Sequence, residues 1–238
     1  MTLSPAARTL LQLRARLAAR FRLIDVPVTL PHTGISYQVL QPATFDRLLT
    51  AAARDPEQNL PYWATIWPSG IALADLLLTR PDVLAGVPAV EIGSGLGITA
   101  TAALQAGLDL LATDYSPETL LLCRATALRN TGRAPRALRF NWRQPSPTFL
   151  NKSPWPLALA ADVLYERRDV IPLLRLMEQI VAPGGMLWLA EPGRPPAQRF
   201  VELIVERGWR DEAVQHAGPW PDPQDEGVVV TIHLLRRP

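Results

Sequence analysis

The sequence of 238 residues contains one cysteine, Cys123, and one lysine, Lys152, among its 24 basic residues. A single cysteine cannot form a disulfide within the chain or supply the cysteine cluster of a structural zinc site. Because such a chain is typical of a reducing compartment, we expect a cytoplasmic protein. The abundance of arginine, alanine, leucine and proline is typical of a GC-rich genome, so we also expect a bacterial source.

Long apolar runs are missing as well. No stretch of about 18 apolar residues is uninterrupted, so a membrane span is not expected. The net charge is only +2 and the arginines are scattered, so no nucleic-acid partner is expected although the isoelectric point is about 9.0. Five arginines and no acid precede Asp25. An amphipathic helix explains this pattern, and an organelle presequence is the alternative.

The first 60 residues predict an extension that precedes the main domain. Ser4 and Pro5 have the character of a helix start, and alternating apolar residues then predict a hairpin that turns at 32–34. The expected elements of the extension are a helix over 4–20, strands over 22–30 and 35–40, and a helix over 44–54.

The expected main domain covers 61–238 and has one early helix over 68–80. From Val87 onward, apolar strands alternate with helices, which predicts βαβ units and a doubly wound α/β sheet with helices on both faces. The last two strands follow each other without a helix and should pair antiparallel. The expected strands are 87–92, 108–113, 136–141, 156–162, 185–190, 210–216 and 227–235, and the expected helices are 97–106, 117–130, 167–181 and 195–207.

A glycine-rich loop, Glu91-Ile92-Gly93-Ser94-Gly95-Leu96-Gly97, joins the first of these strands to a helix. Glycines there allow a sharp turn and let a ligand approach the main chain, although a turn without a ligand explains them too. Asp114 ends the next strand about twenty residues later, where a carboxylate accepts the hydroxyls of an adenosine ribose. An acid two residues before the first glycine suits an ammonium group better than a pyrophosphate. The spacing therefore favours S-adenosylmethionine (SAM) over a dinucleotide.

This loop, followed by Thr113-Asp114-Tyr115, resembles the class I SAM-dependent methyltransferases, whose Rossmann-like sheet has the order 3-2-1-4-5-7-6 with strand 7 antiparallel. Three more stretches resemble the seven-strand protein-lysine methyltransferases, and most of all those that act on the electron-transfer flavoprotein β subunit. They are PYWATIWPSGIALADLL over 61–77, AADVLYE over 160–166 and EPGRP over 191–195. The resemblance implies methyl transfer from SAM to a lysine of that protein substrate, with S-adenosylhomocysteine (SAH) as product.

The resemblance also implies where the acceptor binds. Asp162 and Tyr165 follow the fourth strand and are expected to be catalytic, with the carboxylate orienting the amine and the tyrosine acting as its hydrogen-bond partner. The alternative for Asp162 is a cap on the next helix. Glu191 and Arg194 belong to the expected substrate-side loop, in which Glu191 replaces the aspartate of the family, and a plain surface residue is the alternative for Arg194.

On the cofactor side, the resemblance places Trp67 near the methionine part of SAM and Asn141 with Trp142 near the adenine. A core aromatic is the alternative for Trp67. The expected cofactor contacts are Trp67, Glu91, Gly93, Ser94, Gly95, Gly97, Asp114, Tyr115, Asn141, Trp142 and Ala161. His32, His216 and His233 have no metal-ligand spacing, so no metal is expected.

Other functions remain open at this point. A small-molecule N-methyltransferase has the same fold, since fold alone does not fix the substrate. A noncatalytic SAM-binding scaffold would bind SAM without turnover, and a dehydrogenase would bind NAD. A base-modifying methylase is disfavoured because Val163 and Leu164 replace the two prolines that help to grip a flipped base.

Overall fold

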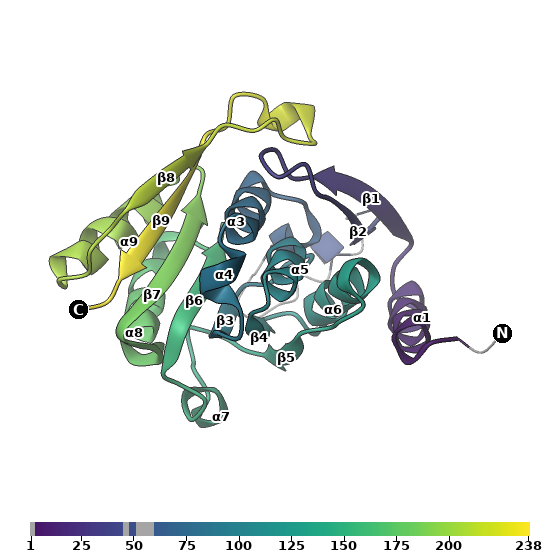
Figure 1. The fold of residues 1–238 in the computed structure, drawn as a ribbon, viewed down its shortest axis with the longest axis horizontal. Coiled ribbons are helices and arrows are strands. Elements are labelled where there is room, and N and C mark those ends of the chain that lie inside the picture. Colours follow the sequence, from purple (N-terminus) through teal and green to yellow (C-terminus); the bar gives the residue numbers. More distant parts are fainter. Residues whose placement is uncertain (1–2, 45–47, 51–59) are drawn as a thin grey trace.

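The structure is a computed structural model that describes residues 3–44, 48–50 and 60–238. Its main feature is a seven-stranded sheet with the order β5-β4-β3-β6-β7-β9-β8 (Figure 1). Strand β9 is antiparallel to both of its neighbours, and the other neighbouring pairs are parallel. This order is the 3-2-1-4-5-7-6 order expected from the sequence, so the predicted fold class is confirmed.

The elements follow the predicted order closely. The strands of the large sheet are β3 (Pro88–Ile92), β4 (Asp109–Asp114), β5 (Arg136–Arg139), β6 (Trp155–Ala161), β7 (Val181–Glu191), β8 (Ala213–His216) and β9 (Val230–Arg236). The helices of this domain are α3 (Pro68–Leu78), α4 (Pro81–Leu84), α5 (Ile98–Gln105), α6 (Pro117–Thr131), α7 (Pro147–Leu150), α8 (Val170–Ile180) and α9 (Pro195–Glu206).

The differences from the prediction lie at element ends and in short helices. The short helices α4 and α7 are not expected from apolar periodicity, because four residues do not complete a repeat. Strand β7 begins at Val181, before the expected start at 185, because its pairing with β6 already starts at Trp155 and Val181, and the register then shifts before Met186. The helix expected over 44–54 falls mostly on residues outside the described ranges, and residues 48–50 are helical.

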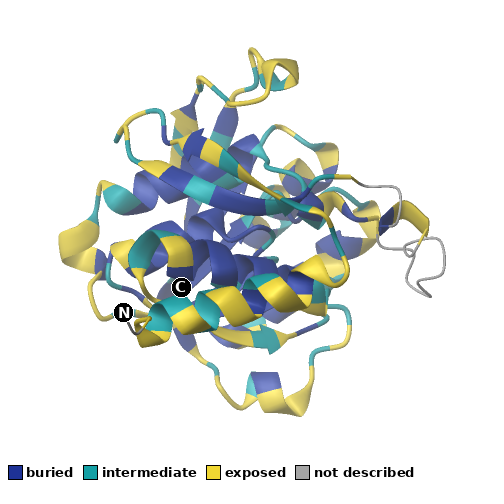
Figure 2. Cartoon of the chain, turned by 90° about the vertical axis from the view of Figure 1, so that its right-hand side faces the viewer, coloured by how far each residue is buried: buried dark blue, intermediate teal, exposed yellow. Residues whose placement is uncertain are grey.

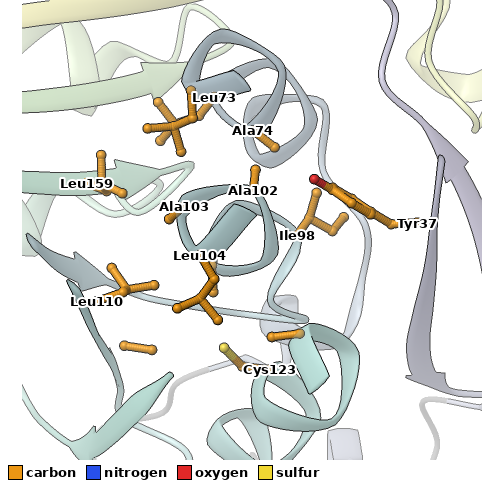
Figure 3. Packing of buried hydrophobic residues seen from close by; sticks show 14 of the residues in the cluster. Tyr37, Leu73, Ala74, Ile98, Ala102, Ala103, Leu104, Leu110, Cys123 and Leu159 are labelled. Atoms are coloured by element: carbon orange, nitrogen blue, oxygen red, sulfur yellow. The ribbon is translucent and has the colours of Figure 1, made fainter. Parts of the chain in front are cut away.

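The central strand β6 shows how the two faces of the sheet are covered, since alternate side chains point to opposite faces. Leu157 and Leu159 pack in one hydrophobic cluster with α3, α5 and α6, whereas Ala158 and Ala160 pack in a second cluster with α8 and α9. The two helix layers are visible in Figure 1. In Figure 3, small residues such as Ala102 of α5 allow the helices of the first layer to approach each other.

The N-terminal part packs against the first of these layers. It consists of α1 (Pro5–Ala18) and a hairpin of β1 (Leu23–Thr29) and β2 (Ser36–Pro42). Leu17, Val28 and Val39 are buried in the same cluster as α5 and α6, while the outer surface of α1 is exposed (Figure 2). The domain boundary at residue 60 stays a prediction, because the residues on both sides of it share one core. Within the described ranges, no helix has the length and apolar character needed to cross a membrane.

Candidate active site

A cavity of about 480 Å³ lies at the carboxyl ends of β3, β4 and β6. The strand order changes direction between β3 and β6, and ligands of open α/β sheets bind at such a switch point. All the cofactor contacts expected from the sequence line this cavity, and so do both residues expected to be catalytic. They are Trp67, Glu91, Gly93, Ser94, Gly95, Gly97, Asp114, Tyr115, Asn141, Trp142, Ala161, Asp162 and Tyr165.

The three glycines of the loop have different roles. Each has a positive φ angle, which an L side chain rarely adopts. A Cβ atom on Gly97 would lie 2.6 Å from Cα of Cys123, and one on Gly93 would lie 2.8 Å from a methyl group of Val163. For Gly95 the nearest atom is 3.8 Å away. Gly93 and Gly97 therefore serve the packing of the protein on itself, which the sequence did not reveal, and Gly95 leaves the main chain open to a ligand.

The carboxylates of Glu91 and Asp114 lie at the carboxyl ends of the neighbouring strands β3 and β4, where Glu91 is the last residue but one and Asp114 the last. Asp114 accepts N–H bonds from Gly95 (3.2 Å) and Ser116 (3.1 Å), and burial raises its pKa to about 6. Burial, together with the nearby charge of Asp114, raises the pKa of Glu91 well above its usual range. A bound cation or hydroxyl donor would stabilise the ionised form of these two carboxyl groups.

Two buried polar atoms at this end of the cavity lack a partner. Oε2 of Glu91 and Oγ of Ser94 have no hydrogen-bond partner among the residues that the structure describes. A buried polar atom left unpaired costs about 1 to 3 kcal/mol. A ligand with ammonium and hydroxyl donors would satisfy these atoms, so the donor set fits the amino acid and ribose groups of SAM.

A buried aspartate that the sequence did not reveal braces the expected adenine side. The carboxylate of Asp169 is fully buried and accepts a hydrogen bond from Nε1 of Trp142 (3.0 Å). It also accepts two from the guanidinium of Arg143, at 2.7 and 3.0 Å. Asp169 thereby fixes the indole that lines the cavity. No motif marks it, because it ends the short helix over Arg167–Asp169 and lies 27 and 26 residues away from Trp142 and Arg143.

On the acceptor side, the backbone of Asp162 is unusual. Its φ angle is +53°, and it is the only residue other than glycine with a positive φ in the described part of the chain. Such a conformation costs about 1 to 2 kcal/mol and marks functional sites when the surroundings enforce it. The N–H group of Asp162 is held by the carbonyl of Ala190 on β7 (2.9 Å).

The side chain of Asp162 forms a two-point ion pair. Nε and one terminal nitrogen of Arg194 donate to its two carboxylate oxygens at 2.6 and 3.1 Å. The aspartate side chain is 5% exposed and the arginine side chain 34%. The next helical turn, over Arg167–Asp169, has Glu166 as its N-cap, so Asp162 is not a helix cap. The structure thus joins a residue expected in the catalytic pair to one expected in the substrate-side loop.

Three aromatic rings form a connected row that reaches this ion pair through Trp67, and we call them the aromatic mouth: Tyr62, Trp67 and Tyr165. The ring of Tyr62 lies edge-on to Tyr165 and to Trp67, with centroids 5.1 and 6.1 Å apart. The guanidinium of Arg194 lies 5.6 Å from the Trp67 ring centroid. Burial raises the pKa of Tyr165 above its usual range, so its hydroxyl stays protonated. Tyr62 was not expected in the site, although it belongs to the PYWATIW stretch.

Glu191 lies behind the site and does not line the cavity. Its carboxylate accepts N–H bonds from Gly193 (2.6 Å) and Arg194 (2.9 Å), and so fixes the loop that carries Arg194. His233 lies 3.7 Å from Glu191 and 2.7 Å from Asp211. Burial would lower the pKa of His233, but these two carboxylates raise it to about 9. Glu191 is therefore a support of the loop, within a chain of contacts from Asp211 to Arg194.

The fold and the cavity define the class of the protein as a SAM-dependent methyltransferase, and solved structures agree in fold. The N-methyltransferase NodS of Bradyrhizobium japonicum, in complex with SAH, has a TM-score of 0.53 and 19% identity, and the match covers 81% of this chain and 100% of that chain. The magnesium protoporphyrin IX methyltransferase of Synechocystis, with bound SAM, has a TM-score of 0.55 and 13% identity, over 71% and 78%.

The chain belongs to the lysine methyltransferase family, whose model matches residues 57–206. It is 48% identical over 159 residues to the human electron transfer flavoprotein beta subunit lysine methyltransferase, covering 61% of this chain and 56% of that protein. The Xenopus laevis protein of the same name is 29% identical over 76% of this chain and 78% of its own. A histone-arginine methyltransferase of Xenopus laevis is 27% identical over 55% and 57%.

The chain spans about half the length of the human relative and of the rat relative, where 52% is covered. The family match confirms the predicted resemblance, and SAM is the cofactor of this class. The family model ends before β8 and β9.

Proposed function

We propose that the protein transfers methyl groups from SAM to lysine side chains of the electron-transfer flavoprotein β subunit. The observation that carries this proposal is the single cavity in which Glu91 and Asp114 lie at one end and Asp162 at the other. The names of the similar proteins support the choice of substrate. The cytoplasmic location and the bacterial source expected from the composition belong to the same proposal.

The cofactor half of the site follows from the chemistry of its donors and acceptors. In the proposal, Glu91 receives the ammonium group, Asp114 receives the ribose hydroxyls and Trp142 packs near the adenine. The main chain at Gly95 and the ring of Trp67 line the path between them. When bound, SAM supplies a methyl group on a positively charged sulfur, which makes that carbon open to direct displacement. The residues of the chain then contribute alignment, which in favourable cases is worth about 7 to 11 kcal/mol.

The acceptor half selects and orients an amine. Lysine has a reference pKa of about 10.4, and only its neutral form has the free electron pair that forms the new N–C bond. The aromatic mouth offers ring faces to a cationic side chain as it enters. A carboxylate has about four acceptor positions, so Asp162 has room to accept an amine N–H while Arg194 holds both oxygens. The neutral hydroxyl of Tyr165 supplies a second hydrogen-bond partner.

In this mechanism Arg194 keeps the carboxylate of Asp162 in one orientation and shields its charge. Asp162 therefore acts as an orienting acceptor, and the amine loses its proton to water before the attack. The N–C bond then forms as the S–C bond breaks, and the proton that remains in excess on nitrogen leaves to solvent.

Incubation of the purified chain with radiolabelled SAM and purified electron-transfer flavoprotein tests the proposal. The expected result is label on lysine of the β subunit, located by mass spectrometry, and labelling about 100-fold slower with an Asp162→Asn variant that still binds SAH. Label on arginine would instead indicate an arginine methyltransferase activity, as in the name of the Xenopus laevis histone-arginine relative, and would overturn the proposed lysine specificity. Label only in small molecules of a cell extract, or SAH binding without any turnover, would support the small-molecule enzyme or the scaffold and overturn the proposal.

A further inference from the structure

Three side chains with metal-binding groups meet outside the cofactor cavity, and we call them the His–Asp–His cluster: His32, Asp75 and His216. They come from the turn between β1 and β2, from α3 and from the end of β8. One ligand atom of each lies within 4.8 Å of those of the other two. No local pattern indicates this cluster, because 43 residues separate the first two residues and the third lies near the other end of the chain.

The carboxylate of Asp75 is fully buried and fixed by the hairpin turn. Its Oδ1 accepts bonds from the N–H and the hydroxyl of Thr33, at 2.9 and 2.7 Å. Its Oδ2 accepts the N–H of His32 at 2.6 Å and lies 3.1 Å from Nδ1 of the same residue. The carboxylate therefore has one oxygen held by Thr33 and one oxygen that faces an imidazole.

His216 provides a second and independent observation. It is only 6% exposed, and its Nδ1 is buried with no hydrogen-bond partner in the described part of the chain. Its ring lies edge-on to that of His32, with centroids 4.5 Å apart. An imidazole nitrogen without a partner in a buried position is costly, unless an additional group binds there.

One distance in the cluster already suits a zinc ion. Zinc bonds to imidazole nitrogen and carboxylate oxygen are about 2.0 to 2.2 Å long, so two ligands of a tetrahedral ion lie about 3.3 Å apart. The separation of 3.1 Å between Nδ1 of His32 and Oδ2 of Asp75 is close to this value. The ligand atoms of all three residues lie within 4.8 Å of one another, so zinc binding requires a rotation of the His216 ring that brings a nitrogen nearer. The side chain of His32 is 54% exposed, which leaves the fourth position open to water.

We propose that His32, Asp75 and His216 form a zinc site that fastens the N-terminal hairpin to α3 and to the edge strand β8. Two imidazoles and one carboxylate form a ligand set that binds zinc in preference to Mg²⁺ or Ca²⁺. The ion lies at the base of the segment that connects β8 to β9. In that segment, Asp225 is near enough to Asp162 and Arg194 to interact electrostatically with both. The site thus braces a segment that reaches the acceptor side.

Metal binding by the full chain, without a histidine tag and after chelator dialysis, tests the proposal. We expect calorimetry to show one Zn²⁺ per chain and Co²⁺ to give the visible absorption of a four-coordinate site. A hundredfold excess of Zn²⁺ over its Kd should raise Tm by about 5 °C. Mg²⁺ and Ca²⁺ at the same concentration should give no shift.

The variants His32→Ala, Asp75→Asn and His216→Ala should each lose the Zn²⁺ stoichiometry and the Co²⁺ absorption. His233→Gln is the matched control, because His233 is the one histidine outside the cluster. His32 is largely exposed, so its replacement leaves the core intact, and circular dichroism verifies the fold. A wild-type chain that binds no Zn²⁺, or a His32→Ala variant that binds it as tightly as the wild type, would overturn the proposal. None of these readouts depends on methyl transfer.

Discussion

Glu91 and Asp114, on the cofactor side of the cavity, are buried with raised pKa values, whereas Asp162, on the acceptor side, has an arginine bound to both of its oxygens. All three carboxylates end strands of the same sheet or directly follow them. The difference lies in what the protein itself supplies. On the cofactor side an acceptor oxygen remains unpaired among the described residues, and on the acceptor side the protein has already placed the counter-ion.

This contrast indicates that the two sides of the cavity differ in how far the protein alone satisfies their polar groups before a ligand binds. The cofactor side is incomplete by itself, so its ligand has to provide the missing donors, and binding should depend on pH. The acceptor side is organised before any ligand arrives, at the cost of a strained backbone at Asp162. The following variants and titrations sharpen or break this comparison, beginning with the largest effect.

Gly97→Ala should destabilise the fold by about 3 kcal/mol, because its Cβ would collide with the backbone of Cys123 and the residue would keep a left-handed conformation. Urea unfolding measures this. Gly95→Ala is the matched change in the same loop. We expect it to lower the free energy of unfolding by only about 1 kcal/mol and to weaken SAH binding by about tenfold or more. Equal losses of stability in the two variants would contradict the division of roles among the glycines.

Asp162→Asn should lower kcat about 100-fold, which corresponds to about 2.7 kcal/mol, while the Kd for SAH changes little. The reason is that, in the proposed mechanism, Asp162 faces the amine and the other half of the site holds the cofactor. Steady-state kinetics and calorimetry separate the two effects. Glu166→Gln changes a nearby carboxylate that pairs with Arg168, and it should keep full activity. A parallel loss of SAH binding in Asp162→Asn would remove the distinction between the two halves.

The affinity for SAH should fall about tenfold per pH unit below about pH 6, because the Asp114 carboxyl is protonated there in the free protein and has to ionise on binding. Above pH 6 Asp114 is ionised and its own contribution to this dependence disappears. Calorimetry between pH 5 and pH 8 measures it. Asp114→Asn should bind SAH more weakly and lose most of the slope. A wild-type Kd for SAH that stays constant down to pH 5 would show that binding does not require the ionised carboxylate of Asp114.

His233 should contribute about 1 kcal/mol of stability that disappears in alkaline solution. Its pKa is raised from the usual histidine value of 6.5 to about 9 in the folded protein, so its contribution is complete below about pH 6.5 and is lost as the pH rises through about 9. The difference in unfolding free energy between the wild type and His233→Gln, measured from pH 6 to pH 9.5, tests this. The gap between them should shrink with pH, and a constant gap would show that the charge of His233 does not support Glu191.

The order of the sheet and most of the residues that line the cavity were predictable, for a physical reason. Alternating apolar runs and glycine punctuation are local signals, and parallel βαβ units permit few arrangements. Asp114 and the glycine loop end neighbouring strands, so their meeting in space follows directly from the fold. Asp169 was not predictable, since its burial depends on packing between α8 and the segment after β5, and no local pattern records that contact.

The sequence by itself determined the sheet, the family and the residues at the strand ends, because hydrophobic periodicity and short motifs act over a few residues. Only the tertiary structure decided which partners these residues have. It paired Asp162 with Arg194, made Glu191 a support of the loop, assigned two of the three glycines to packing, and brought His32 and His216 together around Asp75. Such pairings depend on the distance and direction of side chains from remote segments, and these are fixed only when the whole core has packed.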